Sequence, residues 1–154
     1  MHLFLIRHAH ALDGANDALR PLSPKGRRQV KQLAGFLRRA GAFDPTEIWH
    51  SSLVRAVETA DLLVRRLTAR LVRRPVADLA PEADPRRLVR RLARSKVGVA
   101  LVGHEPHLSA LASLLVTGRR SPPVFVLKKC SVLALERSGR RWGVCWQISP
   151  ELFG

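Results

Sequence analysis

The sequence predicts an α/β domain with three layers, in which helices cover both faces of a mostly parallel central sheet. Apolar runs typical of buried strands alternate along the chain with segments whose apolar residues recur at helical spacing. The run over 97–103 is apolar throughout, as expected of a central parallel strand. Apolar residues make up 46% of the 154 residues, so we expect a single domain over 1–154 with a core of its own.

The first half of the chain contains two predicted strand–helix pairs. A strand over 2–7 is followed by a helix that begins at Pro24, because proline suits a first helical position, and Gly41 can end this helix. A short strand over 47–50 precedes a second helix over 53–67, which carries its apolar residues on one face. This order is that of parallel strands joined by crossover helices.

The second half of the chain continues the alternation of helices and strands and then ends in short strands only. Asp84 followed by Pro85 predicts the cap and the first residue of a basic helix. The apolar strand over 97–103 comes next, and a helix with one apolar stripe begins at Pro106. Short strands close the chain near 124–127, 131–136 and 142–148.

The chain is strongly basic, with 27 lysines and arginines against 12 acidic residues and a net charge of +15. A field of this sign attracts phosphates, acidic protein faces, nucleic acid or anionic lipid. Solvated arginines on helix faces would explain the same charge without any partner. The charge alone therefore leaves the function open.

Cysteine usage and the first residues favour a cytoplasmic protein. Cys130 and Cys145 match no zinc or disulfide framework, which is typical of a reducing compartment. The apolar run near the N-terminus has no basic region before it, and it is too short for a signal peptide or a membrane span. We therefore expect a cytoplasmic location without membrane association.

Polar residues follow three predicted strands at the point where each strand ends. Arg7 and His8 close the first strand, His104 follows the strand over 97–103, and Arg55 lies in the first turn of the second helix. In open α/β sheets, ligands bind outside the carboxyl ends of the strands, so these side chains should converge. The planar fork of arginine suits phosphate oxygens, and a neutral imidazole beside it can attack phosphorus in line. The four residues together predict phosphoryl transfer that requires no metal.

Five segments in chain order carry a further signal. They are LIRHAHA at 5–11, RPLSPKG at 20–26, SSLVRAVETA at 51–60, VGHEP at 102–106 and FVLKK at 125–129. Together they resemble the motifs of the histidine phosphatase superfamily, and specifically those of its small SixA-like branch of phosphohistidine phosphatases. Ala9 stands where the first motif has glycine, and Cys130 follows the double lysine where glycine is expected.

The resemblance implies a phosphoglycerate-mutase-like fold and a phosphatase that needs neither metal nor cofactor. It implies that His8 is the nucleophile that becomes phosphorylated, that Arg7 and Arg55 clamp the phosphoryl oxygens, and that His104 stabilises the transition state. Arg20 is expected as a further phosphate contact. The expected substrate is phosphohistidine on a protein, with small phosphate monoesters as the alternative.

The sequence does not fix a proton donor for the leaving group. Glu82 and Asp84 lie in the appropriate region, but Asp84 is interpreted as a helix cap and Glu82 as a solvated loop residue; Glu105 is interpreted as a helix-start residue. A protonated phosphohistidine releases a neutral imidazole, which leaves far more readily than an alkoxide and needs little help from an acid. A phosphohistidine substrate therefore suits a site whose acid is Glu82, Asp84 or absent.

Two other classes of function remain open. His8-x-His10 and His104-x-x-His107 together offer imidazoles at metal-ligand spacing, so a metallohydrolase is the rival enzyme, although no carboxylate ligand stands at a suitable position. In a phosphatase, His10 and His107 would be rim residues or substrate contacts. A nucleic-acid or acidic-protein binding module without catalysis would explain the basic face at 86–94, but it leaves the histidines unexplained. The oligomeric state cannot be read from the sequence.

Overall fold

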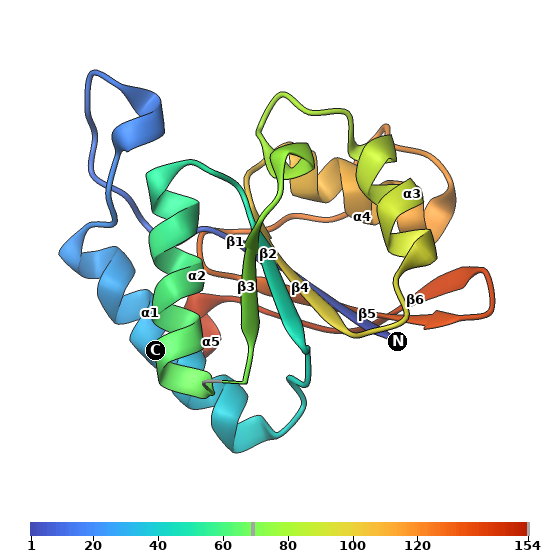
Figure 1. Ribbon diagram of the computed structural model, residues 1–154, viewed down its shortest axis with the longest axis horizontal. Coiled ribbons are helices and arrows are strands. Elements are labelled where there is room, and N and C mark those ends of the chain that lie inside the picture. The colour runs from blue at the N-terminus through green and yellow to red at the C-terminus, as the bar shows by residue number, and fades with distance from the viewer. Residues whose placement is uncertain (69, 154) are drawn as a thin grey trace.

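β1 (His2–Arg7) and β4 (Val99–Gly103) lie side by side in the middle of a six-stranded sheet. The computed structural model describes residues 1–68 and 70–153, and the strands follow the order β3-β2-β4-β1-β5-β6 across the sheet (Figure 1). The other strands are β2 (Glu47–His50), β3 (Val72–Pro75), β5 (Val132–Ser138) and β6 (Arg141–Ile148). β1 to β4 run parallel, β5 is antiparallel to β1 and β6 is antiparallel to β5, so the predicted mostly parallel α/β sheet is confirmed.

Helices cover both faces of this sheet. α1 (Pro24–Ala40), α2 (Val54–Leu67) and α5 (Pro150–Phe153) lie on one face, and α3 (Pro85–Arg94) and α4 (His107–Thr117) lie on the other (Figure 1). Two short 3-10 turns, η1 (Asp17–Leu19) and η2 (Ala77–Leu79), belong to the connections. The three layers expected from the sequence are therefore present.

The alternation of side chains along β1 explains why two layers of helices are needed. Phe4 and Ile6 belong to the hydrophobic cluster under α1 and α2, whereas Leu3 and Leu5 belong to the cluster under α3 and α4. These four side chains are at most 1% exposed, because successive residues of a strand point to opposite faces. A strand that is apolar on both faces can only be stable when both faces are covered.

The helix ends follow the predicted chemistry. The Ser23 side chain caps α1 by accepting from Gly26 N–H at 3.0 Å, and Pro24 is the first helical residue. Gly41 ends α1 in the left-handed conformation, with φ of 64°. The Asp84 side chain caps α3 by accepting from the Arg86 N–H at 3.0 Å.

Two elements differ from the prediction. No strand forms over 124–127, because side chains rather than a neighbouring strand bond to this backbone: Arg7 donates to the Leu127 carbonyl at 3.1 Å, and Gln147 donates to the Val126 carbonyl at 2.6 Å. Conversely, β3 is missing from the prediction. All four residues of β3 are exposed, so the strand has no alternation of apolar and polar residues to reveal it.

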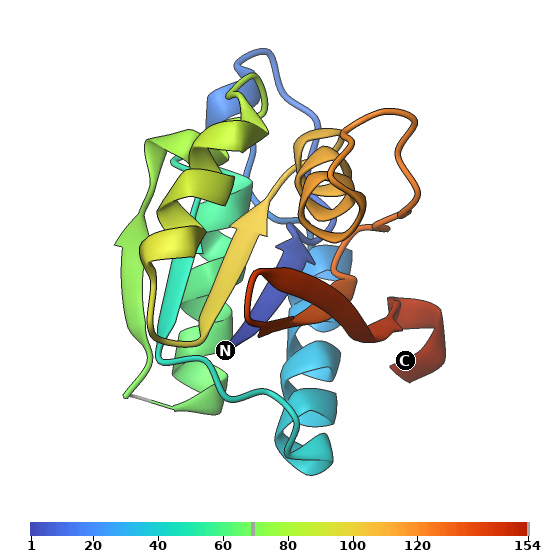
Figure 2. The same ribbon diagram turned by 90° about the vertical axis from the view of Figure 1, so that its right-hand side faces the viewer.

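The carboxyl ends of the parallel strands point to one end of the molecule. In Figure 2 the arrowheads of β1 and β4 point the same way, toward the loop that follows β1 and the segment that precedes α3. No helix within 1–68 and 70–153 is both long enough and apolar enough to cross a membrane.

Candidate active site

Two histidines meet at the carboxyl ends of β1 and β4. Arg7 and Gly103 are level in the parallel register, and the His8 N–H donates to the Gly103 carbonyl at 3.0 Å. His104 follows Gly103 directly. The ring centroids of His8 and His104 are 5.1 Å apart, with their planes inclined by 49°. The structure thus brings together the two histidines that the sequence places after separate strands.

One ring nitrogen of His8 is fixed as a proton donor. Nδ1 lies 2.7 Å from the Ala9 carbonyl oxygen, which can only accept, so Nδ1 carries the proton in the neutral ring. Burial lowers the pKa of His8 to about 4; the bond to Ala9 opposes this shift, and the nearby Arg55 and Arg7 guanidinium groups add to it. His8 is therefore neutral near pH 7, with the lone pair of the ring on Nε2.

His104 is held from the neighbouring strand. Its Nε2 shares a hydrogen bond of 2.7 Å with Ser51 Oγ, and the Ser51 N–H donates to the Val102 carbonyl at 3.1 Å. Burial is the main cause that lowers the pKa of His104 to about 3, and repulsion from a protonated His8 and from the Arg55 guanidinium group adds to this shift. Ser51 also caps the following turn through the Leu53 N–H, at 3.1 Å, so one hydroxyl serves both the turn and the imidazole.

The two predicted arginines lie beside His8. Arg55 is 6% exposed, and its two terminal nitrogens donate to the Asp17 carbonyl at 2.8 Å and to the Asp17 carboxylate at 3.2 Å. Arg7 donates to the Leu127 carbonyl at 3.1 Å. Within the described residues, the buried Nε–H groups of Arg7 and Arg55 have no acceptor. Each guanidinium is thus braced at its tip and keeps a donor that an anion could use.

Arg20 reaches this group only through Asp17. Its Nε donates to the Leu12 carbonyl at 2.8 Å and one terminal nitrogen donates to the Asp17 carboxylate at 3.1 Å. The hydrogen bond from Arg20, and after it the one from Arg55, lowers the pKa of Asp17. Asp17 is a residue that sequence reasoning missed. The signal available for it was the spacing Asp17-x-x-Arg20, which suits an ion pair across one turn.

The arrangement of two neutral imidazoles and two guanidinium groups at a strand edge can be compared with known proteins. A model of the histidine phosphatase superfamily (branch 1) matches residues 3–77, which include Arg7, His8, Arg20 and Arg55. The phosphohistidine phosphatase SixA of Escherichia coli (strain K12) is 28% identical over 155 residues, which cover 97% of this chain and 94% of SixA. The chain belongs to the histidine phosphatase superfamily.

Other proteins similar to this chain differ in how much of their length it covers. The mitochondrial serine/threonine-protein phosphatase PGAM5 of Mus musculus is 39% identical over 85 residues, which are 54% of this chain and 28% of PGAM5. The chain therefore matches little more than a quarter of the length of that relative. A structure of the protein histidine phosphatase SixA complexed with tungstate has a TM-score of 0.88 at 22% identity, and each chain is covered completely. This likeness confirms the α/β fold.

The loop after His8 is held against α1 and α2 in this histidine phosphatase chain. The Ala9 N–H donates to Thr59 Oγ1 at 3.1 Å, and Thr59 in turn donates to the Arg55 carbonyl at 2.7 Å. Gly26 lets the loop pass α1, because a Cβ there would lie 2.0 Å from the His10 carbonyl oxygen. The glycine of segment 20–26 is thus a spacing requirement of the loop that carries His8.

The turn at Cys130 supports the same loop from the other side. The Cys130 N–H lies 3.0 Å from the Arg7 carbonyl and 3.2 Å from the His8 carbonyl. Cys130 has φ of 60°, in the left-handed region that favours glycine, which agrees with the glycine expected there from the family motif. Ala9, which also replaces an expected glycine, is not among the residues with positive φ.

The two outer histidines lie in different surroundings. His10 is partly exposed and shares a 2.6 Å hydrogen bond with Ser23 Oγ, as a rim residue would. His107 is 3% exposed, so the expectation that it lies on the rim is wrong; as the first residue of α4 it packs inward. Both its ring nitrogens are buried without a partner among the described residues. Within 1–68 and 70–153, no three His, Cys, Asp or Glu side chains gather closely enough to hold a metal ion.

Three carboxylates near the edge have distinct positions. Asp84 caps α3, and Glu105 accepts from the Ser109 N–H at 2.9 Å and from the Ser109 hydroxyl, so both are bound to helix starts as expected. Glu82 is exposed in the segment before α3 and lines a cavity of about 400 Å³ together with His107. Glu82 is therefore the one of the three that is not bound to a helix start.

Proposed function

We propose that the protein is a phosphatase that removes the phosphoryl group from phosphohistidine on another protein, through a covalent phosphohistidine intermediate on His8. The observation that carries this proposal is the state of His8. Its proton is held on Nδ1 by Ala9, and burial keeps the ring neutral, so Nε2 offers a lone pair beside two guanidinium groups. A relative named phosphohistidine phosphatase covers nearly the whole chain, which supports the substrate class.

In the proposed first step, His8 Nε2 forms a bond to phosphorus while the bond from phosphorus to the substrate nitrogen breaks. The leaving imidazole takes the electron pair of that bond and departs neutral if its other nitrogen carries a proton. The guanidinium groups of Arg7 and Arg55 stabilise the negative charge on the equatorial oxygens of the phosphoryl group. His104, whose ring centroid is 5.1 Å from that of His8, contacts the same group.

In the proposed second step, water hydrolyses phospho-His8. The water oxygen forms a bond to phosphorus, and the electron pair of the nitrogen–phosphorus bond returns to Nε2. The two protons of the water stay on the released phosphate or pass from it to the solvent. Inorganic phosphate is released and His8 is again neutral, with its proton still on Nδ1. Fixed hydrogen-bond donors at the phosphoryl oxygens stabilise the transition state of such a step, and Arg7 and Arg55 would supply these donors.

The remaining expectations from the sequence belong to the same proposal. We infer that residues 1–154 act as one domain, because both hydrophobic clusters are built on one sheet. We also infer a cytoplasmic location, because Cys130 and Cys145 are free thiols.

A phosphomonoesterase of small metabolites is the second candidate, and Glu82 is the observation that favours it. An alkoxide leaving group needs a proton, and Glu82 is exposed on a cavity that also borders Pro106, two residues after His104. If Glu82 is the acid, Glu82→Gln should slow the hydrolysis of an alkyl phosphate strongly while leaving that of phosphohistidine nearly unchanged.

The experiment that tests the proposal is mass spectrometry under neutral or alkaline conditions on protein quenched during turnover. Phosphohistidine on a protein and a generic phosphate ester would be supplied separately, with His8→Ala as the control. Phosphate on His8, with faster turnover of phosphohistidine, is the expected result. An adduct formed only from small esters would contradict the proposed substrate, and activity that is lost in EDTA without an adduct would contradict the mechanism.

A further inference from the structure

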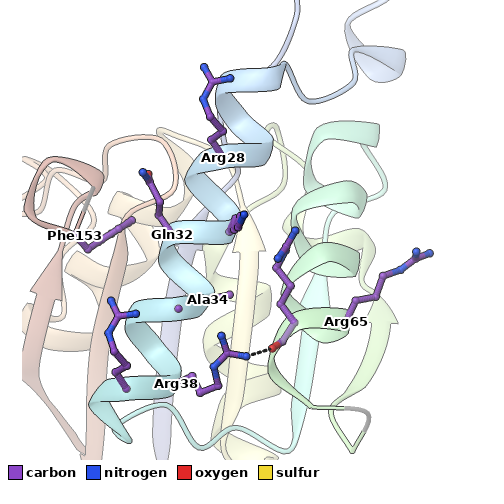
Figure 3. A pocket seen from close by; sticks show the side chains of 10 residues that line it. Arg28, Gln32, Ala34, Arg38, Arg65 and Phe153 are labelled. Carbon is purple, nitrogen blue, oxygen red and sulfur yellow. Dashed lines mark hydrogen bonds between the residues drawn. The ribbon is translucent and has the colours of Figure 1, made fainter.

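A basic groove lies between α1 and α2, away from the histidines. It encloses about 740 Å³, and its walls come from both helices, with Phe153 of α5 at one side (Figure 3). Six cationic side chains line it, and none of its lining residues is acidic; the six are Arg28, Lys31, Arg38, Arg39, Arg65 and Arg66. We define this surface as the α1–α2 groove.

Two small residues belong to the lining of the α1–α2 groove, together with the six cations. Ala34, which Figure 3 shows between the longer side chains, and Gly35 are the small residues that α1 contributes to the lining. A Cβ at Gly35 would already lie 3.3 Å from an Arg39 guanidinium nitrogen. The small residues thus let the Arg39 guanidinium lie close to the backbone of α1, where its charge faces the groove.

Most of these charges are not used within the chain. Arg65 pairs with Asp61 at 2.9 Å, and Arg38 donates to the Arg66 carbonyl at 3.2 Å, as the dashed line in Figure 3 shows. Among the described residues, four cations of the groove have no acidic or hydrogen-bonding partner for their side chains; these are Arg28, Lys31, Arg39 and Arg66. An exposed groove of like charges is repulsive unless an anionic partner is present.

The charge of α1 opposes the stability of the helix at its start. Lys25, Arg27 and Arg28 lie at the N-terminal end, where the helix dipole disfavours cations, and the first turn holds no acidic residue. Arg38 and Arg39, in the last turn, are favourable to the dipole and need no other explanation. Arg27 lies 3.6 Å from a glutamate of α2, so its charge is used within the fold. Arg28 lines the groove and has no acidic partner among the described residues, so its charge points to a role outside the folding of the helix.

α1, which forms one wall of the groove, begins beside the candidate active site. α1 begins directly after Ser23, whose hydroxyl is 2.6 Å from His10 Nδ1. Burial lowers the pKa of His10, and the charges of Lys129 and Lys25 add to this shift. The 17 residues of α1 extend about 25 Å from that edge. A partner that extends from the groove along α1 toward its first residue would reach the edge of the sheet that carries His8.

We propose that the α1–α2 groove docks an acidic segment of the phosphoprotein substrate; this rests on the proposed function. Charge complementarity identifies the chemistry, since all charged residues that line the groove are cations and the partner must supply carboxylates. Nucleic acid is disfavoured, because Phe153 is the single aromatic residue among the lining residues and offers little for stacking. A membrane surface is disfavoured because the cations line a hollow between two helices rather than a flat face.

The chain offers a matched control on the opposite layer. α3 carries five arginines and no acidic residue, but Arg91 lies over the Trp49 ring at 4.9 Å and Arg87 is 3.8 Å from Asp78. Arg90 and Arg94 are exposed, as are Lys31 and Arg39 of the groove. The double variants Lys31→Glu/Arg39→Glu and Arg90→Glu/Arg94→Glu therefore change the net charge equally, on two different faces.

The first test is binding. Fluorescence anisotropy with labelled poly-L-glutamate should show Kd raised about tenfold or more by the groove variant and much less by the α3 variant. Equal losses in both variants would overturn the proposal, because net charge alone would then explain binding. An oligo-dT or phosphatidylserine vesicles that depend on the groove more strongly than poly-L-glutamate would also overturn it, in favour of nucleic acid or a membrane.

The second test is turnover. With an acidic carrier protein phosphorylated on histidine by phosphoramidate, the groove variant should raise KM about tenfold and leave kcat unchanged, while para-nitrophenyl phosphate is hydrolysed at the normal rate. An unchanged KM for the acidic phosphoprotein would overturn the docking role even if His8 still forms its adduct. The wild-type protein could form no His8 adduct while the groove variant still binds poly-L-glutamate more weakly than the α3 variant does. The proposed function would then be wrong, and binding of an acidic ligand in the groove would still be supported.

Discussion

The two facing imidazoles make the stability of the fold depend on pH. Burial is the main cause that lowers the pKa of His8 to about 4 and that of His104 to about 3, from an ordinary value of 6.5. Between pH 6.5 and these values, the unfolded chain binds protons that the folded chain excludes. The contribution of these two rings to the free energy of unfolding is therefore fully present above pH 6.5 and is lost as the pH is lowered toward 4.

The size of this effect follows from the two shifts. At pH 5 an imidazole in the unfolded chain is almost fully protonated, whereas both buried rings remain neutral. Each ring then removes about 2 kcal/mol of stability relative to neutral pH, so the pair removes about 4 kcal/mol. This is a large part of the total stability of a typical domain, about 5–15 kcal/mol.

Urea denaturation at pH 7 and pH 5 measures this loss directly. His8→Asn and His104→Asn cannot take up a proton in this range, so each should reduce the loss between the two pH values by about 2 kcal/mol. The comparison uses the difference between pH values for each variant, so a general change in stability from the substitution cancels. A variant that loses as much stability as the wild type between pH 7 and pH 5 would refute the assignment of buried neutral rings.

Four further substitutions test the loop, the turn, the helix start and the anion site. Gly26→Ala should lower the stability by about 3 kcal/mol, since its Cβ would lie 2.0 Å from the His10 carbonyl oxygen. Cys130→Gly should be about 1 kcal/mol more stable than Cys130→Ala, because only glycine relieves φ of 60°. His107→Leu should raise the stability by about 1 kcal/mol, because two unpartnered ring nitrogens leave the core. Arg55→Ala should lower kcat/KM about 100-fold or more.

Thermal melting of the purified variants checks the first three of these, and steady-state kinetics on para-nitrophenyl phosphate checks the fourth. A Gly26→Ala protein with wild-type melting would show that the loop after His8 does not rest on α1. Alanine as stable as glycine at position 130 would remove the conformational argument there. A destabilised His107→Leu protein would mean that the imidazole has partners, such as ordered water, and near-normal kinetics of Arg55→Ala would remove this arginine from the mechanism.

The parts of the site that follow a regular strand were predictable from the sequence. β1 and β4 are apolar on both faces, and a histidine directly after each strand must lie at the carboxyl edge. The parts built by tertiary contacts were not predictable. Asp17 lies in a connection without apolar periodicity, and nothing near it in the sequence indicates that its carboxylate meets Arg55, 38 residues further along the chain.

The same distinction applies to Arg20 and to the segment before β5. Arg20 was expected at the phosphate because of its place in a motif, and this stays a prediction; what the sequence could not indicate is that its Nε and one terminal nitrogen donate to the Leu12 carbonyl and to Asp17. The segment 124–127 is apolar enough for a strand, yet its carbonyls accept from Arg7 and Gln147. Local propensity cannot foresee which distant side chain will compete for a backbone group.

The exposed strand β3 also has a consequence for how the protein behaves at high concentration. A sheet edge with free N–H and carbonyl groups can template pairing with another copy and lead to aggregation. Here Arg73 and Arg74 project from this edge strand, bound to Asp61 at 3.6 Å and to Glu47 at 3.3 Å, and Pro75 removes one backbone donor. β3 was not predicted because its exposed sequence shows no alternation of apolar and polar residues, and the arginines and proline of the same sequence protect this edge of the sheet against pairing with a strand of another molecule.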